Sequence, residues 1–203
     1  MRLEKGAPPE EAAVSSTARR ALTVLLALAG VALPVTAIFV PAVLPAAAPV
    51  CSISWGSAPE DVRVLGRAPV TAVGTGSDRC WDRVVFTLPG PAAGYSVAYV
   101  DTVEQDGSGD VLPVPGGAKL RVQLHHPAYD DGGNATLTPP VSPGRPLADV
   151  SGFRTLRSVI YGGSFEGGTT IGVGTRTRLP FRVFTLEGPG SGSRIVIDVA
   201  HHW

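Results

Sequence analysis

From residue 51 onward, apolar and polar residues alternate with a period of two through most of the chain. The clearest example is a pair of runs at 181–186 and 194–199, separated by a loop of Gly, Pro and Ser. Alternating β-branched and aromatic residues interrupted by Gly and Pro are typical of a β-hairpin. We therefore predict a hairpin whose buried face carries Phe181, Val183, Ile195, Ile197 and Val199.

Similar runs occur upstream at a spacing of roughly 8–12 residues, which is typical of all-β domains. Strands are expected at 51–56, 70–73, 80–88, 95–100, 119–125, 153–165 and 169–175. Turns are expected at 74–78, 106–110 and 166–168, and a long surface loop at 127–149.

The segment 58–67 has no clear pattern, although Pro59-Glu60-Asp61 would suit the opening of a helical turn. No stretch after residue 50 has the spacing of an amphipathic helix. The pattern predicts an all-β fold, a single β-sandwich-like domain of about eight to nine short strands, with a barrel as the other arrangement.

The first 50 residues have a different character. Arg19 and Arg20 precede an uncharged run at 21–40, about the ~20 residues that a helix needs to cross a bilayer. By the positive-inside rule, the N-terminus is cytoplasmic and everything after residue 50 is outside. We predict a disordered cytoplasmic tail at 1–18, a signal peptide or single-pass membrane-anchor helix at 19–50, and one extracytoplasmic β-domain at 51–203.

Three fates of this leader are distinguished by its sequence. The apolar run exceeds the ~7–15 residues of a cleaved signal-peptide core, which favours a retained anchor. Cleavage after Ala48 would leave Pro49 beside the cut, which is unfavourable for a peptidase. Lipidation of Cys51 requires a small residue before it, and Val50 is not small. The protein is expected to be anchored to the cytoplasmic membrane, or secreted if the leader is removed.

Composition adds a covalent prediction and one exclusion. The formal net charge is zero, so no overall field favours nucleic acid as a partner. The two cysteines, Cys51 and Cys80, lie in a chain that is expected to be exported, which favours a disulfide between them. Closing that loop would stabilise the fold by roughly 3 kcal/mol.

No motif of a catalytic or metal site stands out. The chain has neither a G-x-S-x-G nor an H-E-x-x-H sequence. Its histidines form two adjacent pairs, 125–126 and 201–202, and neighbouring strand residues point to opposite faces. A zinc site across both pairs with Asp198 is less favoured than polar residues at strand ends. We expect no enzyme, no metal and no cofactor, with a hydrolase as the least favoured alternative.

Basic residues gather in the C-terminal half, where only Glu166 opposes them over a long stretch. Arginines at every second position of paired strands would line one face of the sheet. They could bind an anionic polymer through bidentate contacts. The candidate ligand-binding residues are Arg154, Arg157, Arg176, Arg178 and Arg182, with Arg194 on the hairpin and with Tyr161 and Phe165 as surfaces for stacking sugars.

A simpler interpretation of these arginines is a solvated sheet face. On that interpretation their charge is balanced by Asp82, Asp149 and Asp198. The three tryptophans are expected to pack in the core or at its rim rather than to serve as ligand platforms; they are Trp55, Trp81 and Trp203.

Eight short segments follow one another in a characteristic order. They are C-S-I-S-W-G at 51–56, R-C-W-D-R-V-V-F at 79–86, G-Y-S-V-A-Y-V at 94–100, D-G-S-G at 106–109, G-F-R-T-L at 152–156, S-F-E-G-G-T-T-I-G-V-G at 164–174, L-P-F-R-V-F at 179–184 and R-I-V-I-D-V at 194–199. In this order they resemble the AMIN-like domain of secreted and lipid-anchored actinobacterial proteins. The resemblance covers essentially 51 to 203.

The resemblance implies a compact β-sandwich outside the membrane. The related AMIN domain accompanies peptidoglycan amidases and secretins and is thought to localise them by binding cell wall. By this analogy the chain is a non-catalytic cell-envelope module that binds peptidoglycan or another anionic wall polymer. The alternative is a protein–protein interaction module for an envelope secretion or division complex.

Overall fold

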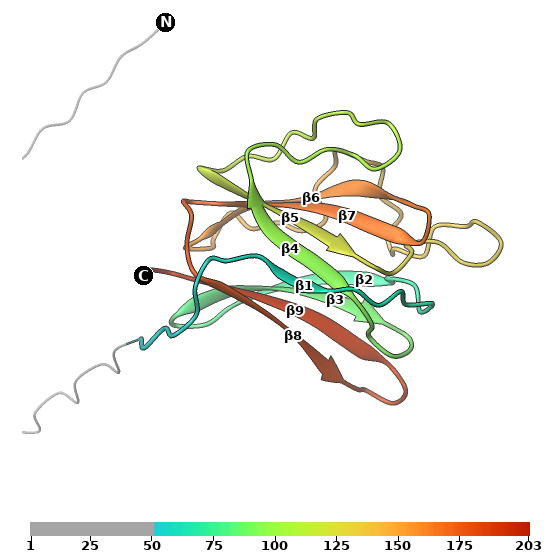
Figure 1. Ribbon diagram of the computed structural model, residues 1–203, viewed down its shortest axis with the longest axis horizontal. Helices are drawn as coiled ribbons and strands as arrows, with labels where there is room; N and C mark the ends of the chain where they lie inside the picture. Colours follow the sequence, from blue (N-terminus) through green and yellow to red (C-terminus); the bar gives the residue numbers. More distant parts are fainter. Residues whose placement is uncertain (1–50) are drawn as a thin grey trace, which may run out of the picture. The chain divides into compact units, whose positions relative to one another are not determined.

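Two antiparallel β-sheets packed face to face make up the domain (Figure 1). The computed structural model describes residues 51–203, so the predicted tail at 1–18 and leader at 19–50 lie outside the described residues. The five-stranded sheet has the order β1-β4-β5-β7-β6, and the four-stranded sheet the order β2-β3-β9-β8. This two-layer, all-β architecture is the predicted β-sandwich. Within residues 51–203, no helix is long and apolar enough to span a membrane.

Most strands lie where the alternating pattern places them, with ends that differ by a few residues. Their bounds are β1 (Glu60–Val62), β2 (Ala72–Ser77), β3 (Trp81–Leu88), β4 (Tyr95–Val100), β5 (Ala118–Leu124), β6 (Leu156–Phe165), β7 (Gly168–Thr175), β8 (Phe181–Glu187) and β9 (Ser193–Ala200). The turn between β6 and β7 has positive φ angles at Glu166 and Gly167, as a tight hairpin requires.

Three local predictions were wrong. Residues 51–56 form no strand, and the segment that favoured a helical turn contains β1 instead, with Glu60 opposite Val97 of β4. The loop predicted at 74–78 lies largely within β2. Gly74 and Gly76 continue that strand because their neighbours on β3, Val85 and Arg83, supply the pairing that sequence propensity alone does not.

The core fills the space between the two sheets. The hairpin of β8 and β9 contributes the face predicted for it, with all five residues of that face at most 8% exposed. From the facing sheet come Leu120, Leu124 and Ile171, each at most 1% exposed. The period-two pattern therefore identified the buried face of this hairpin correctly.

The first part of the four-stranded sheet's edge at β8 is covered by the segment that leads into β1 and by β1 itself. The amide of Phe181 donates to the carbonyl of Gly56 at 2.8 Å, and the amide of Val183 donates to the carboxylate of Glu60 at 3.1 Å. Burial raises the pKa of Glu60, and its bond from Val183 only partly offsets this. An edge strand with occupied donors is a poor template for further pairing.

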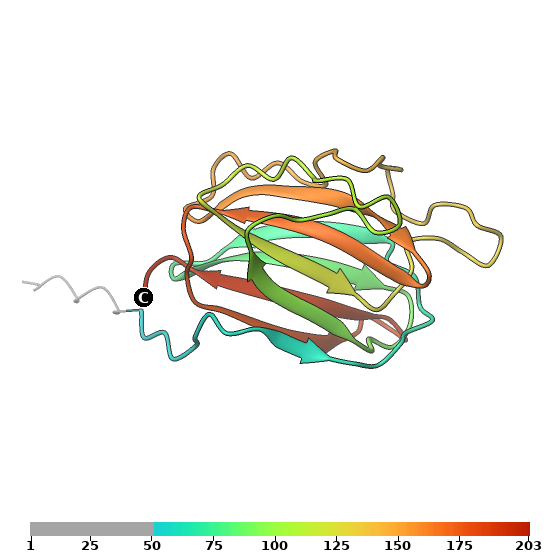
Figure 2. The ribbon, with the colours of Figure 1, turned by 45° about the horizontal axis from the view of Figure 1, so that its top comes forward.

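A smaller apolar cluster covers the outer face of the five-stranded sheet. The connection between β4 and β5 crosses this face and packs Val103, Leu112 and Val114 against Ile160 of β6 (Figure 2). The crossing requires glycines beneath it, since a Cβ at Gly174 would lie 1.8 Å from the carbonyl oxygen of Pro115. The two cores, all nine strands and the disulfide lie within residues 51–203, which form a compact unit with its own hydrophobic core, as expected of a domain that folds independently.

The predicted disulfide between Cys51 and Cys80 is present, with the two Cα atoms 5.5 Å apart. It ties the start of the domain to the residue before β3. Because it closes a loop with a sequence separation of 29, replacing both cysteines by serine should lower the free energy of unfolding by roughly 3 kcal/mol. Urea unfolding of the oxidised protein and of the double variant would measure the difference, and equal midpoints would contradict it.

Candidate functional site

The predicted arginines do not share one face. Arg154 and Arg157 lie at the start of β6, Arg176 and Arg178 lie in the connection between β7 and β8, and only Arg182 lies on the outer face of the four-stranded sheet. The prediction that paired strands align them was wrong. Arg154, Arg176 and Arg178 lie outside the strands, and the strands of Arg157 and Arg182 belong to different sheets.

Tyr161 also departs from the prediction. It is 8% exposed and packs in the core between the sheets, so its ring is not a surface on which a sugar could stack. The other aromatic residue considered for that role, Phe165, is 52% exposed at the end of β6.

Arg182 forms part of a charged row across three strands. The register of β3, β9 and β8 places Arg83, Asp198 and Arg182 directly side by side. Arg83 donates to both carboxylate oxygens of Asp198, at 2.6 and 2.9 Å, and Arg182 donates to the second oxygen from Nε and Nη2, at 3.0 and 2.8 Å. Two cations thus share one anion, and the row keeps a net charge of about +1.

Three aromatic rings surround the guanidinium of Arg182. Its central carbon lies 4.3 Å from the ring centre of Trp55, 5.2 Å from that of Trp81 and 5.1 Å from that of Phe184. These distances lie within the range of cation–π contact. We call this group the Arg182 cluster; its members are Trp55, Trp81, Arg83, Arg182, Phe184 and Asp198.

The Arg182 cluster covers the outer side of β9 in the four-stranded sheet, and its two arginines remain partly exposed to solvent. Asp198 is fully buried on the outer side of β9 and Val196 is 1% exposed there, whereas the side chains of Arg83 and Arg182 are 33% and 39% exposed. The Nη1 atoms of Arg83 and Arg182 have no hydrogen-bond partner within residues 51–203, since both side chains donate to Asp198 through Nε and Nη2. Each arginine can therefore donate outward while its own position stays fixed by Asp198.

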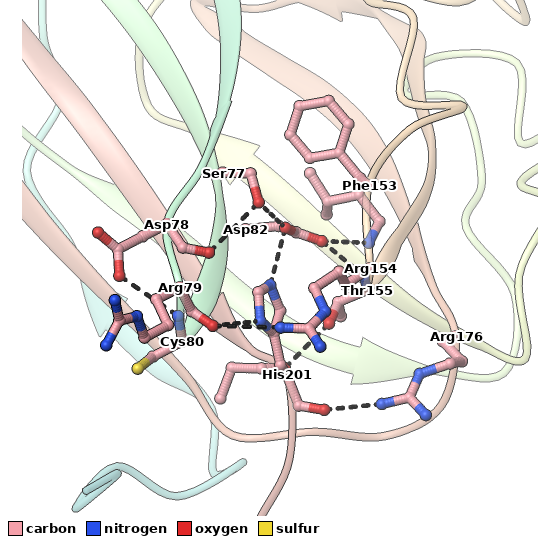
Figure 3. Close-up of polar contacts among 12 residues, drawn as sticks. Ser77, Asp78, Arg79, Cys80, Asp82, Phe153, Arg154, Thr155, Arg176 and His201 are labelled. Atoms are coloured by element: carbon pink, nitrogen blue, oxygen red, sulfur yellow. Dashed lines mark hydrogen bonds and ion pairs between the residues drawn. The ribbon is translucent and has the colours of Figure 1, made fainter. Parts of the chain in front are cut away.

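A second polar group lies between the sheets, around the buried carboxylate of Asp82 (Figure 3). One oxygen accepts from the hydroxyl of Ser77 at 2.8 Å and lies 2.9 Å from Nε2 of His201. The other accepts from the backbone amides of Thr155 and Leu156. This Asp82 network ties β3, β6 and the residue after β9 together at one end of the sandwich.

Serine, histidine and aspartate thus meet, but without the order that nucleophilic catalysis needs. Such catalysis requires the serine hydroxyl to bond the imidazole, which takes up its proton. Here Ser77 bonds Asp82, and the remaining ring nitrogen of His201 lies 3.1 Å from the carbonyl oxygen of Arg79. The arrangement is that of a structural network.

The pKa of Asp82 reflects its hydrogen bonds. Burial alone would raise it, but donation from His201, Thr155, Ser77 and Leu156 outweighs burial, and the pKa falls below its ordinary value of 3.8. A carboxyl with a lowered pKa stabilises the fold above its unfolded-state value, and this stabilisation is lost as the pH falls through the folded-state value.

His126 adds a pH dependence of its own. It is fully buried, accepts from the amide of Ala93 at 2.9 Å and lies 2.8 Å from the carbonyl of Ala68. Burial lowers its pKa from 6.5, the bond to Ala68 opposes this, and the charge of His125 adds to the lowering.

The unfolded chain binds a proton at His126 more readily than the folded chain does, so the free energy of unfolding should fall as the pH drops below about 6.5. Denaturant midpoints at about pH 7 and pH 5 would show this loss. His126→Gln should lower stability at both pH values and reduce the difference between them, which is the slope of stability against pH. A control, His202→Gln, changes an exposed ring and should leave the slope unchanged. Identical slopes in all three proteins would contradict the assignment.

The histidine pairs lie at different places in the fold. His125 follows β5 and His201 follows β9, where its ring contacts Asp82 rather than Asp198. In the part of the chain that the structure describes, no group of three or more His, Cys, Asp or Glu side chains could hold a metal ion.

A comparison with protein families bears on the whole domain. The family model described as the AMIN-like domain matches residues 68–201, more than half of the chain. The chain belongs to the AMIN-like domain family. The match begins just before β2 and ends at His201, so it includes eight of the nine strands, from β2 to β9. No curated protein and no solved structure matches the chain.

Membership of the AMIN-like family suggests a module of the cell envelope. AMIN-like domains are extracytoplasmic, and the disulfide of this one fits such a compartment. Five of the six members of the Arg182 cluster lie within the matched region, and only Trp55 precedes it.

Sequence reasoning found Arg182 but missed most of its surroundings. Trp55 and Trp81 lie on the outer side of the sheet around a cation, partly buried at its rim. The simpler interpretation of the arginines is partly confirmed, because Asp198 does pair with Arg182. Arg83 and Phe184 were visible only as outward positions of strands, and no local pattern marks them as neighbours.

Proposed function

We propose that this AMIN-like domain is a non-catalytic module of the cell envelope that binds peptidoglycan or another anionic wall polymer through the Arg182 cluster. The observation behind this is the pair of guanidinium groups that share one buried carboxylate and keep Nη1 of each free to donate. Carboxylates and phosphates of a wall polymer are matching acceptors.

The aromatic members of the cluster suit the same ligand. Phe184 lies beside both arginines, 5.5 Å from the guanidinium carbon of Arg83 and 5.1 Å from that of Arg182. An apolar ring next to charged donors matches a sugar polymer, which offers C–H faces alongside anionic groups. Since Asp198 fixes the arginines before binding, little side-chain entropy is lost when a ligand arrives.

Co-sedimentation of residues 51–203 with purified sacculi tests the proposal. Binding should be seen at low salt and weaken as salt is added, because exposed charges are screened. Arg182→Lys keeps the charge but loses the planar donors, and should weaken binding at least about fivefold. The matched control Arg121→Lys changes an exposed arginine of the five-stranded sheet and should bind as the wild type does. Absence of binding at low salt would contradict the proposal.

A protein partner is the second candidate, favoured by a different surface. Just after the edge strand β1, Val64 is 54% exposed and Leu65 is 80% exposed. Neighbouring exposed apolar side chains are a common mark of protein interfaces. Crosslinking in cells from a photoreactive residue at position 65 would yield one dominant protein adduct if this surface binds an envelope secretion or division protein. An unreacted chain would remove this candidate.

A further inference from the structure

The end of the domain at the disulfide carries a cluster of exposed arginines. We call it the disulfide end and define it by Arg79, Arg154, Arg176, Arg178 and Trp203, all of which are exposed. Arg79 precedes Cys80, and Trp203 follows β9 at the same end of the four-stranded sheet. None of these residues belongs to the Arg182 cluster.

Three of the arginines are positioned by backbone carbonyls. Arg154 donates to the carbonyl of Arg79 at 3.4 Å, and Arg176 donates from Nη2 to the carbonyl of His201 at 2.7 Å (Figure 3). Arg178 donates to the carbonyl of Ser57 at 3.1 Å. A bond to a neutral carbonyl fixes a guanidinium without neutralising it, so the charge of each remains available.

The nearby carboxylates compensate this charge only in part. Asp82 is fully buried and bonded within its own network, and Asp198 is fully buried between Arg83 and Arg182. The exposed carboxylates at this end are those of Asp78, which accepts from the amide of Cys80, of Asp101 at the start of the connection after β4, and of Asp149, which accepts from the amide of Ser151 in the loop before β6. Four arginines therefore outnumber three exposed carboxylates.

Trp203 adds an apolar group to the same surface. Its side chain is 69% exposed, and its indole nitrogen donates to the carbonyl of Arg178 at 3.1 Å. An exposed tryptophan beside arginines is typical of surfaces that lie at the boundary between water and lipid.

The sequence that precedes the domain indicates which surface would lie near this end. The domain begins at Cys51, and the apolar run predicted to cross the membrane ends at residue 40. The intervening residues 41–50 can span at most about 35 Å, even fully extended. A retained anchor would thus keep the disulfide end close to the membrane surface.

We propose that the disulfide end docks on the anionic phospholipid headgroups of the membrane to which the chain is tethered. The negative surface potential of such lipids attracts arginines. A tether makes a weak contact effective because it raises the local concentration of the domain at the membrane. This inference concerns a surface separate from the Arg182 cluster and does not depend on wall binding.

Co-sedimentation of residues 51–203 with lipid vesicles at low ionic strength tests this proposal without the leader. Vesicles with about one-third phosphatidylglycerol should bind about tenfold more protein than vesicles of phosphatidylcholine, and added salt should remove the difference. The triple variant Arg79→Glu, Arg154→Glu, Arg176→Glu should lose this preference. The control triple Arg63→Glu, Arg67→Glu, Arg121→Glu makes the same change in net charge elsewhere and should retain it.

Fluorescence of Trp203 gives a second readout that survives if the triple variant folds poorly. Brominated anionic lipid should quench part of the tryptophan emission of the wild type, and Trp203→Phe should abolish that quenching. Equal binding to both vesicle types, equal losses in the two triple variants, or no quenching of Trp203 would overturn the proposal. Binding to sacculi by way of these arginines, with no lipid preference, would assign the end to the wall instead and also overturn it.

Discussion

Replacing Asp82 by asparagine is expected to lower the free energy of unfolding by about 3 kcal/mol. Both carboxylate oxygens face donors, with Ser77 and His201 on one side and the amides of Thr155 and Leu156 on the other. The amide group of asparagine must turn its own donors towards one of these pairs. Turned towards Thr155 and Leu156, it leaves two buried backbone donors without an acceptor; turned towards Ser77 and His201, it replaces charge-assisted bonds by neutral ones.

Urea unfolding measures this loss, and Asp78→Asn serves as the matched control four residues away. Asp78 is exposed and accepts a single bond, from the amide of Cys80 at 3.3 Å. Its replacement should change stability by less than about 0.5 kcal/mol. A loss of under about 1 kcal/mol for Asp82→Asn would mean that the network contributes little to the fold.

Replacing Gly174 by alanine is expected to cost about 3 kcal/mol, although only one methyl group is added. The new Cβ would lie 1.8 Å from the carbonyl oxygen of Pro115 and 2.4 Å from the hydroxyl oxygen of Ser158. The first obstacle is backbone and cannot rotate away. The connection over β7 must therefore lift, which opens the small cluster of Val103, Leu112 and Val114.

Gly74→Ala is the matched control, because it makes the same change in another strand. A Cβ at Gly74 meets nothing within 4 Å. Alanine there should be neutral or slightly stabilising, by up to about 1 kcal/mol, since it restricts the unfolded chain. Thermal unfolding of the two variants separates a packing requirement from a general intolerance of side chains in these strands, and equal destabilisation would contradict the account.

The local pattern of the sequence specified most of the fold. Strands such as β4 and the hairpin of β8 and β9 have strong alternation, and their buried faces follow from it directly. The pattern failed at β1 and β2, where Glu60 and Gly74 have low strand propensity and pairing with a neighbour decides the conformation. It could not show that a loop covers the outer face of the five-stranded sheet.

The candidate site was harder to predict because it depends on strand order. Arg83 and Arg182 are far apart in sequence and meet only because β9 lies between β3 and β8. The sequence places Asp198 beside Arg182 once the hairpin register is known, and this much was expected as a balancing charge. The position of β3 on the other side of β9, which brings Arg83 to the same carboxylate, is set by long-range packing.

The most direct test of the central claim is an NMR titration of isotope-labelled residues 51–203 with soluble peptidoglycan fragments. The three indole N–H signals report separately on two surfaces. If wall polymer binds at the Arg182 cluster, the signals of Trp55 and Trp81 should shift in step with the side-chain signals of Arg83 and Arg182, while that of Trp203 stays in place. Shifts confined to Trp203, or no shifts at saturating fragment, would contradict the account.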